Sequence, residues 1–348
     1  MLDKRILWID WIKFLAIFGV IGIHTSSSLL DSEFLFTFTW YEAVFSASLF
    51  RFAIILFIMA SGFLLLRKQQ PIEVIPKRMK RILLPFIFWL IVYALVKVFV
   101  KGALGPNWNV IDLLGYIGNA FVNPMNVSVQ FWYVYMILGL YLISPLLSRW
   151  IQNAPLKEIE YVLTIWLILS ILEFISGKFL LLDYLRYFTG AIGYFILGHY
   201  LDVKDSPLLK NKSFGITLFV IGTLITVIGT IALSLLTNTQ SLFFIRLGDI
   251  TPGACLQGIG LFILVKNIDF DNLSPKINDL VVRISKDSYG IYLVNILVIN
   301  IFEKLHLIDM THFTIIKIFL VMIIVLVVSD VIIDIMGRIK FLNAFSGR

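Results

Sequence analysis

Long apolar runs, separated by short polar breaks, recur along the whole chain. About 20 apolar residues are enough for a helix to cross the hydrocarbon core of a bilayer, and runs near this length are frequent here. Breaks rich in charged residues, proline or asparagine divide the pattern into ten predicted helices, over residues 6–28, 44–66, 82–100, 129–148, 159–176, 184–201, 214–236, 244–265, 287–303 and 313–335. The pattern therefore predicts an all-α polytopic membrane protein with about ten transmembrane helices.

The predicted helices form one unit. The chain has no repeat of fixed period and no low-complexity tract, and its polar segment 202–213 is too short for a soluble domain. A single membrane-embedded domain over residues 1–348 is therefore expected. The first helix carries Asp10 and Lys13, and no small-residue cleavage site follows it. It is expected to stay in the membrane rather than be removed as a signal peptide.

Basic residues are distributed unevenly between alternate loops. With a cytoplasmic N-terminus, the predicted inner segments hold 20 of the 29 Lys and Arg residues, and the outer segments hold four. Cytoplasmic loops are enriched in these residues, so both termini are predicted to be cytoplasmic. The same rule accounts for the net charge of +7, which therefore does not indicate a nucleic-acid partner. The outer loop 101–128 contains an apolar piece, 110–122, expected to dip into the membrane interface or to cap an outward cavity.

Composition and missing motifs exclude several classes of protein. The chain is 59% apolar and 15% charged, with a mean hydropathy of +0.93, whereas about a quarter of the residues of soluble proteins are charged. It has no P-loop, no G-x-G-x-x-G, no H-E-x-x-H and no G-x-S-x-G sequence. Nucleotide hydrolysis, a zinc site and a covalent serine hydrolase therefore have no support. The single cysteine, Cys255, has no partner for a disulfide.

Three ionisable residues lie in the first predicted helix, where charge is expensive to bury. At 100° per residue, Asp10, Lys13 and His24 project from one stripe of the helix, and His24 lies roughly 20 Å beyond Asp10. The stripe is therefore expected to face protein or water. Asp10 and Lys13 can form an intrahelical ion pair, and His24 can simply bind a neighbouring helix. An imidazole also titrates near neutral pH, so His24 is suited to act as a general base.

Three further sets of charged residues need an explanation. Arg51, near the outer end of the second helix, can hold an anionic or carbonyl oxygen or can extend toward the outer surface. Arg246 and Asp249 are three residues apart at the outer start of the eighth predicted helix, a spacing that favours a structural ion pair over a catalytic role. In the inner loop 67–81, Arg78 and Arg81 are one helical turn apart, a spacing that suits phosphate binding. An ordinary positive-inside loop explains the same residues.

Several stretches together resemble the membrane acyltransferase 3 family. IDWIKFLAIFGVIGIHTSS resembles its first helix, FRFAIILFIMASGFLLLRK its second, and RMKRILLPFIFW its basic R-x-x-R-I-x-P motif. VQFWYVYMILGLYLISPLL resembles its fourth helix, and ISKDSYGIYLVN its C-terminal S-x-G-I-Y-L motif. These stretches occur in the family's order, from about residue 5 to about residue 330. Within the family the chain is most similar to the O-acetyltransferases of bacterial surface polysaccharides, including the enterobacterial common antigen type.

The resemblance implies an enzyme of the bacterial cytoplasmic membrane. It would transfer an acetyl or other short acyl group from cytoplasmic acetyl-CoA to a hydroxyl of a cell-surface or lipid-linked glycan, without a metal. His24 would be the central catalytic residue, and Asp10 and Lys13 would line the route. Arg78 and Arg81 would lie near the phosphates of CoA.

The chain departs from the family at two positions. The family often has a histidine just before the fourth-helix tryptophan, Trp132, and another after G-I-Y-L-x, where this chain has Gln130 and Asn295. Amides form hydrogen bonds but do not move protons at neutral pH. With Arg51 and Trp132, these residues are expected to shape an outer, acceptor-binding pocket.

The sequence leaves two other functions open. Charged residues within the membrane also mark the pathways of transporters and flippases, for example of a lipid-linked precursor. A transporter is expected to have two related halves, and the chain has none that can be recognised. The missing histidines also leave open a non-catalytic member of the fold that binds an acyl or glycan ligand.

Overall fold

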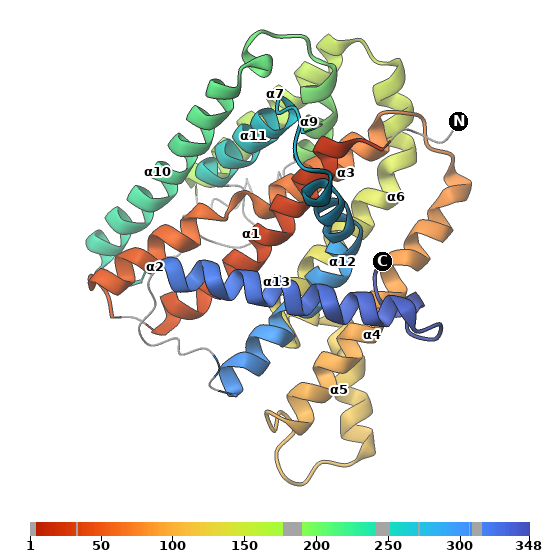
Figure 1. The fold of residues 1–348 in the computed structure, drawn as a ribbon, viewed down its shortest axis with the longest axis vertical. Coiled ribbons are helices and arrows are strands. Elements are labelled where there is room, and N and C mark those ends of the chain that lie inside the picture. Colours follow the sequence, from red (N-terminus) through yellow and green to blue (C-terminus); the bar gives the residue numbers. More distant parts are fainter. Residues whose placement is uncertain are drawn as a thin grey trace.

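The computed structural model describes residues 5–32, 34–176, 190–240, 251–270, 272–305, 307 and 315–348, and every regular element within these ranges is a helix (Figure 1). The α-helices are α1 (Leu7–Ser32), α2 (Phe38–Leu49), α3 (Phe52–Leu66), α4 (Ile75–Phe99), α5 (Val110–Val122), α6 (Trp132–Asn153), α7 (Leu156–Ser176), α9 (Ala191–Val203), α10 (Lys212–Thr237), α11 (Pro252–Lys266), α12 (Pro275–Lys304) and α13 (Ile315–Arg338). The all-α prediction is confirmed. Each of the ten predicted helices overlaps one or more of these helices, although parts of 184–201, 244–265 and 313–335 lie outside the described residues.

Six of the described segments are long and apolar enough to cross a membrane. They are Leu7–Ser27, Phe38–Leu66, Ile72–Phe99, Val129–Asn153, Lys212–Thr237 and Ile315–Arg338. A multi-pass membrane protein follows from these segments, because a lipid-exposed chain must satisfy its backbone hydrogen bonds internally, as a helix does. The count of ten spans stays a prediction.

The prediction of one continuous helix over residues 44–66 is wrong. The helix begins earlier, at Phe38, and is broken at Phe50 and Arg51 into α2 and α3. At the break the Arg51 amide donates to Ser48 O, which leaves the Ala47 carbonyl without its usual amide partner. The Arg51 Nε donates a hydrogen bond to that carbonyl oxygen at 2.9 Å. Gln257 of α11 donates to Ser48 O, also at 2.9 Å, so side chains satisfy the carbonyls freed at the break.

Helices α3 and α9 approach each other at two glycines. A Cβ atom at Gly62 would lie 1.7 Å from the Phe195 carbonyl oxygen, and one at Gly198 would lie 2.0 Å from the Met59 carbonyl oxygen. The two backbones therefore touch, as helices do in membranes where small residues replace bulky ones at the contact. This contact fixes the position of α3, which contributes several residues to the candidate site.

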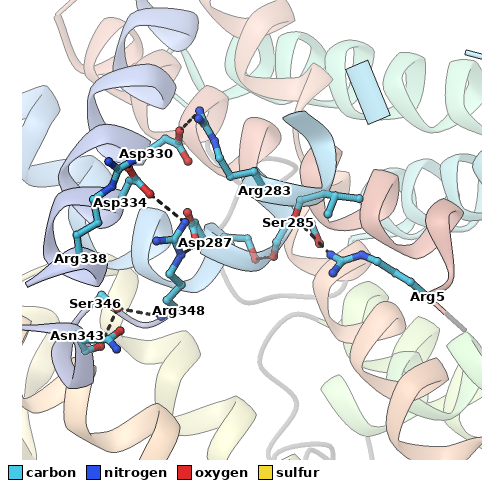
Figure 2. A network of polar contacts seen from close by, with 12 residues as sticks. Arg5, Arg283, Ser285, Asp287, Asp330, Asp334, Arg338, Asn343, Ser346 and Arg348 are labelled. Atoms are coloured by element: carbon cyan, nitrogen blue, oxygen red, sulfur yellow. Dashed lines mark hydrogen bonds and ion pairs between the residues drawn. The ribbon is translucent and has the colours of Figure 1, made fainter. Parts of the chain in front are cut away.

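Ion pairs join the charged first half of α12 to α13, which crosses it (Figures 1 and 2). Arg283 binds Asp330 at 2.5 Å. Asp287, whose side chain is fully buried, pairs with Arg348 at 2.8 Å, and Arg348 also reaches Asp334 at 3.0 Å. Charges on a membrane helix are tolerated when they pair within the protein. The polar part of α12 is thereby joined to α13 and to the C-terminal Arg348.

The apolar piece of the predicted outer loop is the helix α5. Its bounds, Val110–Val122, equal those of the apolar piece, and it begins with a capping box formed by Asn109 and Asp112. Figure 1 shows α5 beside α4, in a part of the protein that projects at the lower end of the view.

Candidate functional site

A large cavity opens among α1, α3, α4, α6 and α12, and its volume is about 580 Å³. Its lining has one carboxylate, Asp10, and seven basic side chains, from Arg5, Lys13, Arg67, Lys68, Arg78, Arg81 and Lys286. Tyrosine and aliphatic side chains make up much of the rest. We call this space the cationic cavity. Four of the predicted site residues line this cavity: Asp10, Lys13, Arg78 and Arg81.

The carboxylate of Asp10 is neutralised by Arg5. The Arg5 Nε and Nη2 atoms donate to its two oxygens at 2.7 and 2.8 Å, and the Ser285 hydroxyl of α12 donates to the same carboxylate at 2.6 Å (Figure 2). Such a bidentate pair is among the stronger contacts in proteins. The ion-pair partner of Asp10 is thus Arg5, and not Lys13, which the spacing in the sequence had suggested. Lys13 lines the same cavity.

Arg78 was predicted in the loop 67–81, but α4 begins at Ile75, so Arg78 lies in its first turns. Only part of its guanidinium is hydrogen-bonded. Its Nη2 donates to Gln70 Oε1 at 2.6 Å, while its Nη1 is buried and has no partner among the described residues. Gln70 is itself held in place, because its backbone amide donates to the Ser148 hydroxyl at 2.9 Å. An unpaired buried donor is costly. Because Arg78 lines the cationic cavity, an anionic ligand there is a suitable partner for this nitrogen.

His24 lies in a second, much smaller cavity, of about 10 Å³. We call it the histidine cavity. Gln130 and Trp132 line it with His24, together with Val20, Ile23, Ile54, Val129 and Tyr292. The structure thus brings His24 together with two of the residues predicted for the outer pocket. Along α1, His24 is eleven residues beyond Lys13, which corresponds to about 17 Å.

Arg51 and Asn295 line neither cavity in the described part of the protein. Arg51 is buried at the break between α2 and α3, where its Nε donates to Ala47 O at 2.9 Å. Asn295 is fully buried, and its Nδ2 donates to the carbonyls of Ile291 and Tyr292 at 3.2 and 2.7 Å. The predicted pair Arg246 and Asp249 lies outside the described residues.

Gln130 also binds the backbone of α12. Its Nε2 donates to Leu293 O over a long 3.5 Å, its Oε1 accepts from the Ser128 hydroxyl, and its carbonyl oxygen accepts from the Tyr292 hydroxyl. The two amides that stand where the family often has histidine therefore hold the same turn of α12, around Tyr292.

Some residues of the site were not assigned a role from the sequence. Ser285 and Tyr292 belong to the stretch ISKDSYGIYLVN, so the motif contained a signal for both. Gln70 and Arg5 carried no signal, because what distinguishes them is a contact to a residue brought near by folding.

The comparison with family models decides the class of this protein. A model described as an acyltransferase domain matches residues 6–334, nearly the whole chain. The chain belongs to the membrane acyltransferase 3 family. The match includes every predicted site residue of this acyltransferase and all lining residues of the two cavities except Arg5 and Gly347. No curated protein and no solved structure matches the chain.

Family membership gives the two cavities of this acyltransferase a chemical context. An acyl transfer needs a place for the donor and a group that activates the acceptor. The described residues offer an open, positively charged cavity for the first and an imidazole in a separate cavity for the second. Among the described residues there is no group of three or more His, Cys, Asp or Glu placed to hold a metal ion.

Proposed function

We propose that this acyltransferase takes an acetyl or other short acyl group from cytoplasmic acyl-CoA and transfers it to a hydroxyl of a cell-surface or lipid-linked glycan. The observation that carries the proposal is the charge of the cationic cavity. Seven basic side chains surround it, and its single carboxylate is already paired with Arg5. Such a lining favours a ligand with several negative charges, as the phosphates of CoA provide.

The location of the basic residues supports a donor that arrives from the cytoplasm. Arg5, Lys286 and the residues of the loop 67–81 all belong to segments that the positive-inside rule puts on the inner side. The proposal includes ten spans, cytoplasmic termini and a bacterial inner membrane. The phosphates would bind at Arg78 and Arg81, with the unused Nη1 of Arg78 as one donor.

His24 would act on the acceptor. Its imidazole nitrogen takes the proton of the acceptor hydroxyl while the hydroxyl oxygen attacks the carbonyl carbon of the thioester. The carbon–sulfur bond then breaks, and the CoA thiolate leaves and receives the proton. A relay in which the imidazole itself first carries the acyl group balances equally well. Gln130 and Trp132, which line the histidine cavity, would position the acceptor.

The test is transfer of radiolabelled acetyl from acetyl-CoA into the lipid and glycan fraction of vesicles that contain the protein. His24→Gln should abolish incorporation while leaving CoA binding within about twofold. The matched control is His199→Gln, a change at a second buried histidine that lines neither cavity and should retain activity. Equal incorporation by the wild type and His24→Gln would refute the role of His24. If the wild type does not bind CoA, the proposal that acyl-CoA is the donor is refuted.

A further inference from the structure

The cationic cavity and the histidine cavity have one wall in common. Among the described residues, Tyr292 of α12 is the only one that lines both. Its side chain is buried, with the whole residue 4% exposed. A change in the position of this one ring would therefore alter the connection between the two spaces.

Within the buried core, the Tyr292 side chain makes one hydrogen bond and one ring contact. Its hydroxyl donates to the carbonyl oxygen of Gln130, and its ring packs against Tyr133 with the centroids 5.1 Å apart. The backbone around it is held more firmly, because Asn295 donates to Tyr292 O at 2.7 Å and Gln130 donates to Leu293 O. A rotation of this ring must break the bond to Gln130 and displace its packed neighbours, whereas the backbone contacts of the turn of α12 do not depend on it.

The histidine cavity is too small for the reaction as it stands. About 10 Å³ is close to the smallest space that holds one water molecule. An acyl thioester and an acceptor hydroxyl need considerably more room beside His24. Tyr292 also lines the cationic cavity, whose volume is about 580 Å³. Space near His24 must therefore be created by movement of a wall, and the shared wall is Tyr292.

We infer that Tyr292 is a gate between the two cavities. When its hydroxyl leaves the Gln130 carbonyl and the ring rotates, the cationic cavity extends to His24 and the acyl end of a bound donor reaches the imidazole. When the ring returns, it separates the thioester from the outer side and excludes water. This inference rests on the proposed function for its ligand, although the gate itself is a property of the two cavities.

Access to the histidine cavity can be measured without any enzyme activity. With the single cysteine removed by Cys255→Ser, a probe cysteine is introduced by Val20→Cys, which lines the histidine cavity only. A membrane-impermeant thiol reagent is added in reconstituted vesicles from the side on which the cationic cavity opens. A second probe, Ser61→Cys, lines the cationic cavity and reports that the reagent enters it.

The gate is opened by Tyr292→Ala, which should raise the labelling rate of the Val20→Cys probe at least tenfold. Tyr292→Phe keeps the ring and loses the bond to Gln130, and should raise the rate about fivefold, as expected for one hydrogen bond. The matched control is Tyr289→Ala. Tyr289 is on the same helix and also donates to a backbone carbonyl, that of Ile82 at 2.9 Å, but it lines only the cationic cavity. It should change the rate less than twofold.

The outcomes separate the gate from the proposed function. Unchanged labelling of Val20→Cys in both Tyr292 variants, with Ser61→Cys still reactive, would overturn the gate even if the wild type transfers acetyl groups. An equal rise with Tyr289→Ala would overturn it as well. Faster labelling confined to the Tyr292 variants supports the gate, and it does so even if no acyl transfer from CoA is detected.

Discussion

Replacing Arg78 by glutamine should weaken CoA binding roughly ten- to a hundredfold. The side chain is part-buried, with Nη2 bound to Gln70 and Nη1 unused among the described residues. If Nη1 binds a phosphate oxygen, the variant loses a hydrogen bond between charged groups, worth about 1.5–3 kcal/mol. Each 1.4 kcal/mol, approximately, changes affinity tenfold. Because this contact is made to the bound donor and does not change during the reaction, the KM for acyl-CoA should rise and kcat should stay.

The assay is equilibrium binding of radiolabelled CoA to the purified protein in lipid nanodiscs. Lys80→Gln is the matched control, because Lys80 is an exposed cation of the same helix that does not line the cationic cavity. It should bind CoA within about twofold of the wild type. Gln70→Ala, which frees Nη2, should cause a smaller loss than Arg78→Gln. The reasoning is refuted if Arg78→Gln binds as tightly as the wild type, or if Lys80→Gln weakens binding equally.

Three further predictions concern packing and charge. Gly198→Ala should lower the thermal unfolding midpoint in detergent through an overpacking cost of about 1–3 kcal/mol. Gly139→Ala, where a Cβ atom meets nothing within 4 Å, should not, and equal midpoints would contradict the contact of α3 with α9. Arg348→Ala leaves the fully buried Asp287 without its partner and should destabilise the protein by about 3 kcal/mol, measured by the same melting assay. The control Arg338→Ala removes a guanidinium that is 77% exposed and should have little effect, so a similar loss in both would argue against a special role of Asp287. Raising the salt concentration from about 0.05 to about 0.5 M should weaken CoA binding several-fold by screening the cationic cavity, and salt-independent binding would show that its charges do not hold the ligand.

The two departures from the family pattern have a structural explanation. Gln130 and Asn295 both donate hydrogen bonds to backbone carbonyls of the turn of α12 that carries Tyr292. An amide performs this task without changing its charge. In this protein the two positions therefore support the wall between the cavities, and the proposed proton transfer depends on His24.

Local sequence determined the helices and the polar stripe of α1. An apolar run in a membrane forms a helix because only internal hydrogen bonds satisfy its backbone there, and this rule needs no knowledge of distant contacts. It was enough to predict helical structure in ten regions, each of which overlaps a helix of the structure. The spacing of Arg78 and Arg81 likewise predicted that both would reach one site, and both line the cationic cavity.

Tertiary structure decided everything that depends on residues far apart in the chain. The break at Arg51 is stabilised in part by Gln257, and the partner of Asp10 beyond its own segment is Ser285, 275 positions away. The division of the polar stripe into two cavities, with Tyr292 between them, arises where α1, α6 and α12 meet. No periodicity records such contacts, because each depends on which side chains the fold brings within a few ångströms of one another.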